Sequence, residues 1–252
     1  MSVVPLQTIV TFLDETLQTR TIPDYPNACN GLQLENNGKV TRIAGAVDAN
    51  VHIIEAAIAQ KADLLFVHHG LTWQGLKPMT GPLYRLYQQA MAANLAIYSA
   101  HLPLDSHPTY GHNVQIAKVL GLKIEGGFAF YNKNSFGWLC QGIERETLCH
   151  RLQALFPRSF HPILYGSLHP QKIAIVSGGG GSSVEEMIAS SIDTLITGEV
   201  HYSVVSLAQL YRLNLLVCGH YATECFGVQA LLPVLQERMQ IPCFFIENFC
   251  EL

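Results

Sequence analysis

The sequence predicts an α/β protein made of duplicated βα units with mostly parallel sheets. Three observations lead to this fold class. Short continuous apolar segments, which are typical of strands buried on both faces, alternate with segments of helical periodicity. This alternation occurs twice, early and late in the chain. The segment between the two stretches has paired glycines and many aromatic residues, and predicts loops and antiparallel strands.

The early stretch opens with an amphipathic helix, because its apolar residues return with helical spacing. These residues are Val4, Ile9, Phe12, Leu13 and Leu17. After it we expect strands at 42–47, 63–67 and 95–98 and helices at 51–60, 82–93 and 111–120. Pro82 is compatible with the first turn of a helix, where its missing N–H would have no partner.

The late stretch repeats this order. We expect strands at 172–176, 193–197, 214–218 and 242–246 and helices at 184–191, 204–211 and 223–239. The segment AAIAQKADLLFVHHG parallels MIASSIDTLITGEV, and NLAIYSAHLPLD parallels NLLVCGHYATE. We therefore expect residues 1–122 and 172–252 to form two duplicated halves of one discontinuous core, with residues 123–171 as an inserted subdomain.

Composition narrows the function classes. The 252 residues include 15 Lys and Arg against 19 Asp and Glu, and this net charge of −4 argues against nucleic-acid binding. Charged residues make up only 13% of the chain, so we expect a homo-oligomer that covers part of its surface. The longest apolar runs are far too short for a transmembrane helix. The N-terminus lacks the basic region of a signal peptide, and the seven cysteines include no CxxC pair, so we expect a cytoplasmic protein with reduced thiols.

The histidines indicate the chemistry. His68 and His69 follow an apolar strand and precede Gly70, at the carboxyl end of a strand, where the ligands of open α/β sheets gather. Adjacent residues of an extended strand point to opposite faces. One metal ion can therefore take both imidazoles only if the strand has ended, whereas two ions could take one each.

Two further elements also follow apolar strands. If a helix begins at His220, then His220 and Glu224 lie one turn apart on the same face, which suits chelation. In the segment HLPLD, Pro103 disfavours helical geometry at Leu102, so we expect a loop from which Asp105 can reach a metal. His101 in this segment could be a ligand, could orient a ligand, or could carry a proton.

These elements together predict a dinuclear metal centre. Its five ligands are His68, His69, Asp105, His220 and Glu224. Two divalent ions with a bridging group suit this number of ligands, and the mixture of nitrogen and oxygen donors fits Zn²⁺, Mn²⁺, Fe²⁺, Ni²⁺ or Co²⁺. Glu199, which follows the strand at 193–197, and His101 are the candidate catalytic proton carriers. Residues Gly178–Gly181 either cradle a phosphate or allow close backbone packing near the site.

A family resemblance rests on seven motifs that occur in this order: NGLQLE, FVHHG, HLPLD, GHN, SGGGG, TGE and GHYATE. The chain resembles the NIF-three-like family, whose members carry the name GTP cyclohydrolase 1 type 2 homologue. The resemblance implies a two-metal α/β protein that assembles as a toroidal homohexamer. It also implies the same five ligands.

The resemblance suggests a metal-dependent hydrolase that attacks a nucleotide or a pterin-like small molecule with a metal-activated water. The motifs contain no cluster of basic residues for a triphosphate, and Lys77 and Arg85 are the nearest in sequence. Two alternatives remain: a non-enzymatic protein that binds or handles divalent metals, and a regulatory interaction protein.

Overall fold

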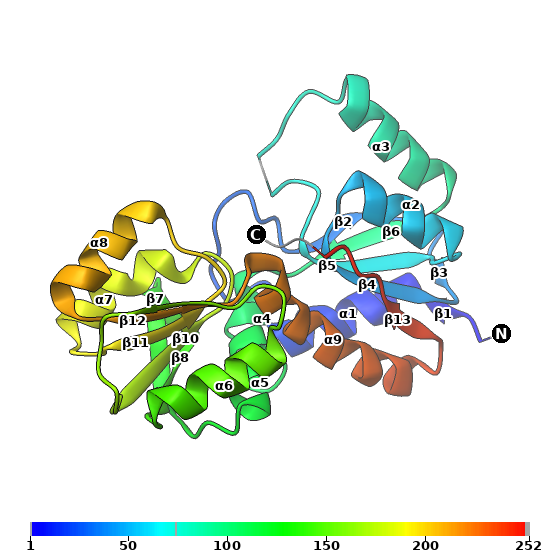
Figure 1. Cartoon of the computed structure of the whole chain (residues 1–252). Helices are drawn as coiled ribbons and strands as arrows, with labels where there is room; N and C mark the ends of the chain where they lie inside the picture. The colour runs from blue at the N-terminus through cyan, green and yellow to red at the C-terminus, as the bar shows by residue number, and fades with distance from the viewer. Residues whose placement is uncertain (1, 74, 250–252) are drawn as a thin grey trace. The chain divides into compact units, whose positions relative to one another are not determined.

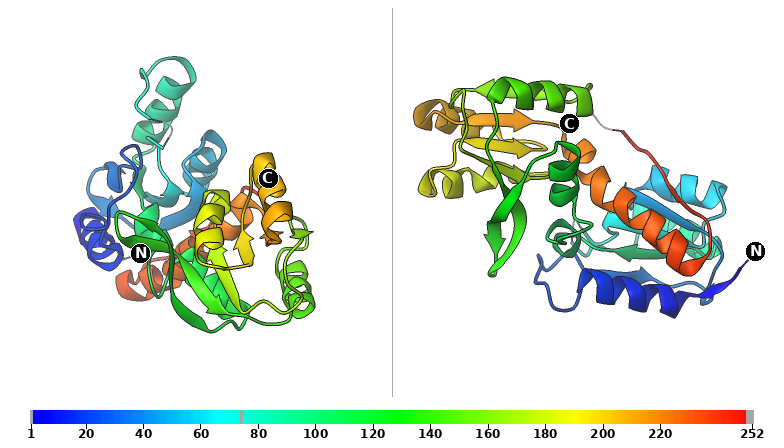
Figure 2. Two further views of the ribbon diagram at one scale, coloured as in Figure 1. Left: turned by 90° about the vertical axis from the view of Figure 1, so that its left-hand side faces the viewer. Right: turned by 90° about the horizontal axis from the view of Figure 1, so that it is seen from below.

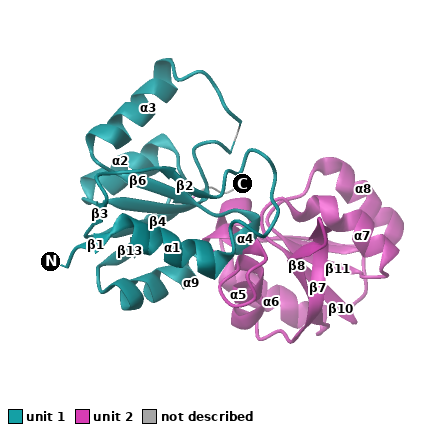
Figure 3. Ribbon diagram, turned by 180° about the vertical axis from the view of Figure 1, so that it is seen from behind, with its two compact units in different colours: residues 1–104, 228–248 teal, residues 105–227, 249–252 magenta. Residues whose placement is uncertain are grey.

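The computed structural model describes residues 2–73 and 75–249, and the chain divides into two compact units (Figures 1 and 3). Unit 1 consists of residues 1–104 and 228–248, and unit 2 of residues 105–227 and 249–252. Each unit contains its own sheet with helices on both faces. The predicted α/β class is therefore confirmed, with parallel and antiparallel strands mixed.

Unit 1 contains a five-stranded sheet with the order β13-β4-β5-β6-β2. Four of its strands are parallel: β4 (Ile43–Asp48), β5 (Leu64–His69), β6 (Ala96–Ser99) and β13 (Cys243–Phe245). The edge strand β2 (Gly31–Leu34) runs antiparallel to β6. A separate antiparallel pair joins β1 (Val4–Pro5) to β3 (Lys39–Val40). The parallel arrangement brings the carboxyl ends of β4, β5 and β6 to one edge of the sheet.

Helices cover both faces of this sheet (Figures 1 and 2). On one face, α2 (Val51–Ala59) and α3 (Gly81–Ala92) contribute Ile53 and Leu86 to a core cluster that includes Val67 of β5. The other face carries α1 (Leu6–Leu17) and the part of α9 (His220–Met239) that belongs to unit 1. A Cβ at Gly45 would lie 2.8 Å from Leu232 of α9, so this glycine allows the helix to approach β4 closely.

Unit 2 contains a six-stranded sheet with the order β7-β8-β10-β11-β12-β9. Its parallel centre consists of β10 (Lys172–Val176), β11 (Thr194–Thr197) and β12 (Asn214–Val217). Antiparallel strands flank this centre: β7 (Ile124–Tyr131), β8 (Asn134–Gln141) and β9 (His161–Leu164). The segment 123–171 therefore extends the sheet of unit 2 on both sides. The observed division into units differs from the halves and the insertion that the sequence suggested, because β8 and β9 pair directly with β10 and β12.

Helices flank both faces of the sheet of unit 2 (Figures 1 and 2). One face packs against α5 (His112–Val119) and α6 (Arg145–Leu155), through apolar side chains such as Ile116 and Leu152. The other packs against α7 (Val184–Ala189) and α8 (Tyr202–Tyr211), through side chains such as Met187 and Ala208. A short 3₁₀ turn, η1 (Gly180–Ser183), precedes α7.

The expected order of elements from residue 42 to residue 99 and from 172 to 246 is present, with ends that differ by a few residues. Both units contain the order strand-helix-strand-helix-strand, from β4 to β6 and from β10 to β12. This shared order agrees with a duplication, which stays a prediction.

One local expectation was wrong. The segment HLPLD is not a plain loop, because Leu102–Asp105 forms the one-turn helix α4. Pro103 is the second residue of that turn, where its lack of an N–H costs no hydrogen bond.

Two further features concern cysteines and membranes. The six cysteines among the described residues are free thiols, and Cys250 lies outside the described residues. Burial raises the pKa of the Cys140 thiol to about 12, with a smaller contribution from Glu125, so this thiol stays protonated. No helix in the described part of the chain is long and apolar enough to cross a membrane.

Candidate metal centre

Three histidines of unit 1 lie together where two neighbouring strands end. His68 and His69 are the last two residues of β5, and His101 follows the adjacent parallel strand β6 by two residues. All three side chains are buried. Because parallel strands bring their carboxyl ends to one edge, the fold places together residues that lie more than 30 positions apart.

The three imidazole rings are in contact. The ring centres of His68 and His69 are 4.6 Å apart, and that of His101 lies 4.9 Å from His68 and 5.5 Å from His69. One ring nitrogen from each histidine lies within 4.8 Å of the other two, which is close enough for one metal ion. Both residues still belong to β5, yet their rings lie side by side, so the alternation of side chains along a strand does not separate them here.

Each of these histidines has an acceptor at Nδ1. Nδ1 of His68 lies 3.0 Å from the carbonyl oxygen of Ala100. Nδ1 of His69 lies 3.0 Å from Oδ1 of Asp48, and Nδ1 of His101 lies 2.9 Å from Oδ1 of Asp24. Acceptors at this position favour the tautomer in which Nδ1 donates its proton and Nε2 carries the lone pair, as is usual for metal-binding histidines.

Asp24 and Asp48 are not among the site residues expected from the sequence. Asp48 ends β4 in the same way that His69 ends β5, so its place after an apolar strand was an available signal. Asp24 lies in the loop after α1, where no local pattern relates it to His101. Burial pushes the pKa of Asp24 upward, but its hydrogen bonds, chiefly from His101, outweigh burial and lower it below its usual value.

Aromatic side chains surround the histidines of unit 1. Trp73 stacks on His69 with ring centres 4.9 Å apart, and it lies 4.1 Å from His101. Tyr25 also contacts His101. Beside His69 is a hollow of about 200 Å³, whose walls include Asp48, Trp73 and Lys77. Lys77 is the one lysine or arginine among the described residues that line it.

In unit 2, α9 begins at His220 and carries Glu224 one turn later, as the sequence spacing predicted. His220 Nε2 lies 3.1 Å from Oε1 of Glu224, and His220 Nδ1 lies 3.1 Å from Oε1 of Glu199. Burial lowers the pKa of His220, but the two carboxylates outweigh burial and raise it to about 9. In the absence of a metal ion, this imidazole is therefore protonated at neutral pH.

The third predicted ligand of unit 2 is Asp105, the last residue of α4. Its side chain is buried, and its Oδ1 accepts a hydrogen bond of 3.2 Å from the Ser177 hydroxyl. The Ser177 backbone N–H in turn donates to the Asn113 side chain. Asp105 is therefore held beside the end of β10, at the start of the glycine-rich segment.

The glycine-rich segment packs tightly against His220 and Glu224. A Cβ at Gly178 would overlap Oε1 of Glu224 and would lie 3.1 Å from Nε2 of His220. A Cβ at Gly198 would lie 2.7 Å from the backbone of His220. These contacts support the interpretation that the glycines permit close backbone packing.

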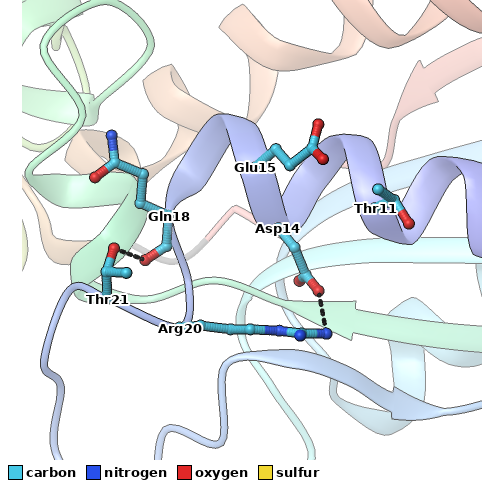
Figure 4. Close-up of a pocket in the computed structure, with 6 residues that line it drawn as sticks. All are labelled: Thr11, Asp14, Glu15, Gln18, Arg20 and Thr21. Carbon is cyan, nitrogen blue, oxygen red and sulfur yellow. Dashed lines mark hydrogen bonds and ion pairs between the residues drawn. The ribbon is translucent and has the colours of Figure 1, made fainter.

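A larger hollow in unit 1 is lined by other residues than the histidines (Figure 4). Its volume is about 400 Å³, and it lies along the end of α1 and the residues that follow. Its walls are formed by Thr11, Asp14, Glu15, Gln18, Arg20 and Thr21. Asp14 is already paired, since it accepts from Arg20 at 3.3 Å and from the Tyr98 hydroxyl at 2.8 Å. This hollow gives no indication of metal chemistry.

Comparison with known proteins finds relatives that match nearly the whole chain. A protein from Pyrococcus horikoshii named "GTP cyclohydrolase 1 type 2 homolog" is 37% identical over 95% of this chain and 96% of its own length. A protein of the same name from Pseudomonas aeruginosa is 33% identical over 97% of each chain.

Solved structures give the same result. The protein ybgI, described as of unknown function, superposes with a TM-score of 0.90 at 28% identity, over 99% of this chain and all of that one. TTHA1606 from Thermus thermophilus has a TM-score of 0.88 at 30% identity, with the same coverage. The model of the Duf34/NIF3 (NGG1p interacting factor 3) family matches residues 4–249. The chain therefore belongs to the Duf34/NIF3 family.

Proposed function

We propose that this protein is a metal-dependent hydrolase that uses two divalent metal ions and acts on a nucleotide or a pterin-like substrate. The proposed ligands are those expected from the sequence: His68, His69, Asp105, His220 and Glu224. The substrate class follows the name of the relatives, GTP cyclohydrolase 1 type 2 homologue.

The observation that carries the proposal is the cluster of buried histidines in unit 1. Buried imidazoles whose Nδ1 atoms are held by acceptors suit a divalent ion better than they suit an apolar core. The donors are imidazole nitrogens and carboxylate oxygens, a set that fits Zn²⁺, Mn²⁺, Fe²⁺, Ni²⁺ or Co²⁺. Ions of this kind supply Lewis acidity and a water whose pKa is lowered toward neutrality.

The geometry also supports roles for Glu199, His101 and Lys77. Glu199 and His101 are the proposed proton carriers. Glu199 accepts the Nδ1 proton of His220 when that ring is protonated, and His101 lies against His68 and His69. We propose that Lys77, in the wall of the hollow beside His69, contacts an anionic group of the substrate.

We further propose a cytoplasmic homohexamer. Support for assembly comes from α8 of unit 2, where Tyr202 and Leu210 are 84% and 73% exposed. Leu164 and Leu168 in the same unit are also exposed. Light scattering at micromolar concentration should give six subunits, and a stable monomer would refute the assembly.

The function is tested by metal analysis of protein purified without chelators, followed by turnover assays. Nucleotides, pterins and phosphoesters should be screened with each of the five metals. Turnover that disappears with a chelator and returns with metal supports the hydrolase. Two bound ions without turnover on any substrate would instead favour a metal-binding or metal-handling protein. If variants of the proposed metal ligands still bind the same protein partners in a pull-down, an interaction protein would be favoured.

A further inference from the structure

Asp24 is a buried loop carboxylate that is surrounded by hydrogen-bond donors. Its side chain is only 5% exposed and accepts four of them. Oδ1 accepts from the Tyr25 backbone N–H at 2.7 Å and lies 2.9 Å from Nδ1 of His101. Oδ2 accepts from the Asn30 amide and from the Leu102 backbone N–H, both at 2.8 Å. The carboxylate is thus enclosed by donors, which fits its lowered pKa.

Asn30 makes a second link between the same two segments. Its Oδ1 accepts from the His101 backbone N–H at 2.8 Å, while its Nδ2 donates to Asp24. Both the backbone and the ring of His101 are therefore held by the loop that contains Asp24 and Asn30. His101 cannot turn its ring without breaking the contact with a buried carboxylate.

This arrangement determines the tautomer of His101. A carboxylate with four approaching donors can only accept, so the neutral ring must carry its proton on Nδ1. The lone pair then lies on Nε2, at the opposite side of the ring, and the ring as a whole lies against His68 and His69.

We propose that Asp24 is a positioning residue, which holds His101 in the Nδ1–H tautomer and directs its Nε2 lone pair into the histidine cluster of unit 1. The use of that lone pair for proton transfer rests on the proposed function. The tautomer itself does not, since it follows from contacts within unit 1 alone.

The first test uses the unaltered, metal-free protein. Long-range ¹H–¹⁵N correlation spectra of the histidine rings, recorded over a series of pH values, distinguish the two neutral tautomers from each other and from the doubly protonated ring. We expect His101 to be in the Nδ1–H form. A predominantly Nε2–H ring would overturn the proposal without any variant.

The second test is Asp24→Asn, which keeps the shape of the side chain. Both carboxylate oxygens accept from donors, so the NH₂ group of the asparagine faces a donor in either orientation. His101 can relieve this conflict by moving its proton to Nε2, because its Nδ1 then accepts a hydrogen bond. We expect the Nε2–H form of His101 to rise to a major population. An unchanged tautomer in a folded Asp24→Asn protein would overturn the proposal.

A matched control is available on the surface. His169 and Glu144 form a histidine–carboxylate pair at 2.7 Å whose side chains are largely exposed. Glu144→Gln should alter the His169 signals and leave those of His101 unchanged. A change at His101 in this control would mean that the tautomer responds to remote substitutions, which would also contradict the proposal.

A Co²⁺ titration of Asp24→Asn separates this inference from the proposed function. If His101 carries protons and is not a ligand, Co²⁺ affinity should stay within about threefold of the unaltered protein. A loss of about 10–100-fold, typical when the partner of a ligand is removed, would make His101 a ligand. That outcome would contradict its proposed proton-carrying role and leave the positioning by Asp24 intact.

Discussion

Nε2 of His220 lies 3.1 Å from Oε1 of Glu224, one turn further along α9, and the same ring contacts Glu199 through Nδ1. An imidazole between two carboxylates binds a proton tightly when no metal is present. The pKa of His220 accordingly rises to about 9, although burial alone would lower it. The proposed metal ligand thus holds a proton that a metal ion must displace.

Stability of the metal-free protein should depend on this proton. Because the pKa of His220 is higher in the folded state than its ordinary value of 6.5, its protonated form stabilises the fold. This contribution is fully present below about pH 6.5 and is lost as the pH rises through about 9. Urea midpoints of metal-free protein should fall across this window, and the fall should be smaller in His220→Gln. An equal fall in both proteins would assign the pH dependence to other groups.

Metal content should depend on His69 at the end of β5 and on Glu224 in α9. The unaltered protein should contain about two ions per chain. The double variant His69→Ala and Glu224→Ala should lose both, because each substitution removes a proposed ligand. Inductively coupled plasma mass spectrometry checks this, with His169→Ala as a control on the exposed surface. Full metal content in the folded double variant would refute the ligand assignment.

Gly178→Ala should weaken metal binding at Glu224. Its φ of +61° disfavours a side chain, and the added methyl group would overlap Glu224. Gly81→Ala is a matched control, since Gly81 has a φ of +57° and no atom within 4 Å of the added Cβ. Both variants should be destabilised by about 1–2 kcal/mol for the left-handed backbone. Only Gly178→Ala should also lose metal affinity, by at least about tenfold. Equal affinities in calorimetric titrations would show that Glu224 is not constrained by this contact.

Glu199→Gln should separate proton transfer from metal binding. The substitution keeps the shape of the side chain but removes a carboxylate that could accept a proton. If the hydrolase proposal holds, kcat should fall by roughly 10²–10⁴ while metal content stays unchanged. Loss of metal would make Glu199 a ligand. Full activity with full metal content would exclude Glu199 as the proton carrier and leave His101 as the candidate for that role.

Several features of this protein follow from local sequence. Apolar runs such as Leu64–Val67 predict buried strands, because a strand covered on both faces has no polar side to show. The positions of His68, His69 and His220 after such runs predict that each of them lies at the carboxyl edge of a sheet. The spacing of His220 and Glu224 predicts their contact, because four residues make about one helical turn. Each of these signals lies within a few neighbouring residues.

Other features were decided only by the tertiary structure. Asp24 contacts His101, which lies 77 positions further along the sequence, and Asp48 contacts His69, which lies 21 positions further. No local pattern encodes such pairs, since they arise when separate strands and loops are brought to one edge of a sheet. The pairing of β9 with β12 was likewise decided by the tertiary structure, because the sequence of an antiparallel edge strand does not indicate which strand it pairs with. The sequence thus predicts which side chains could bind metal, whereas long-range packing decided which carboxylates hold His69 and His101 in place.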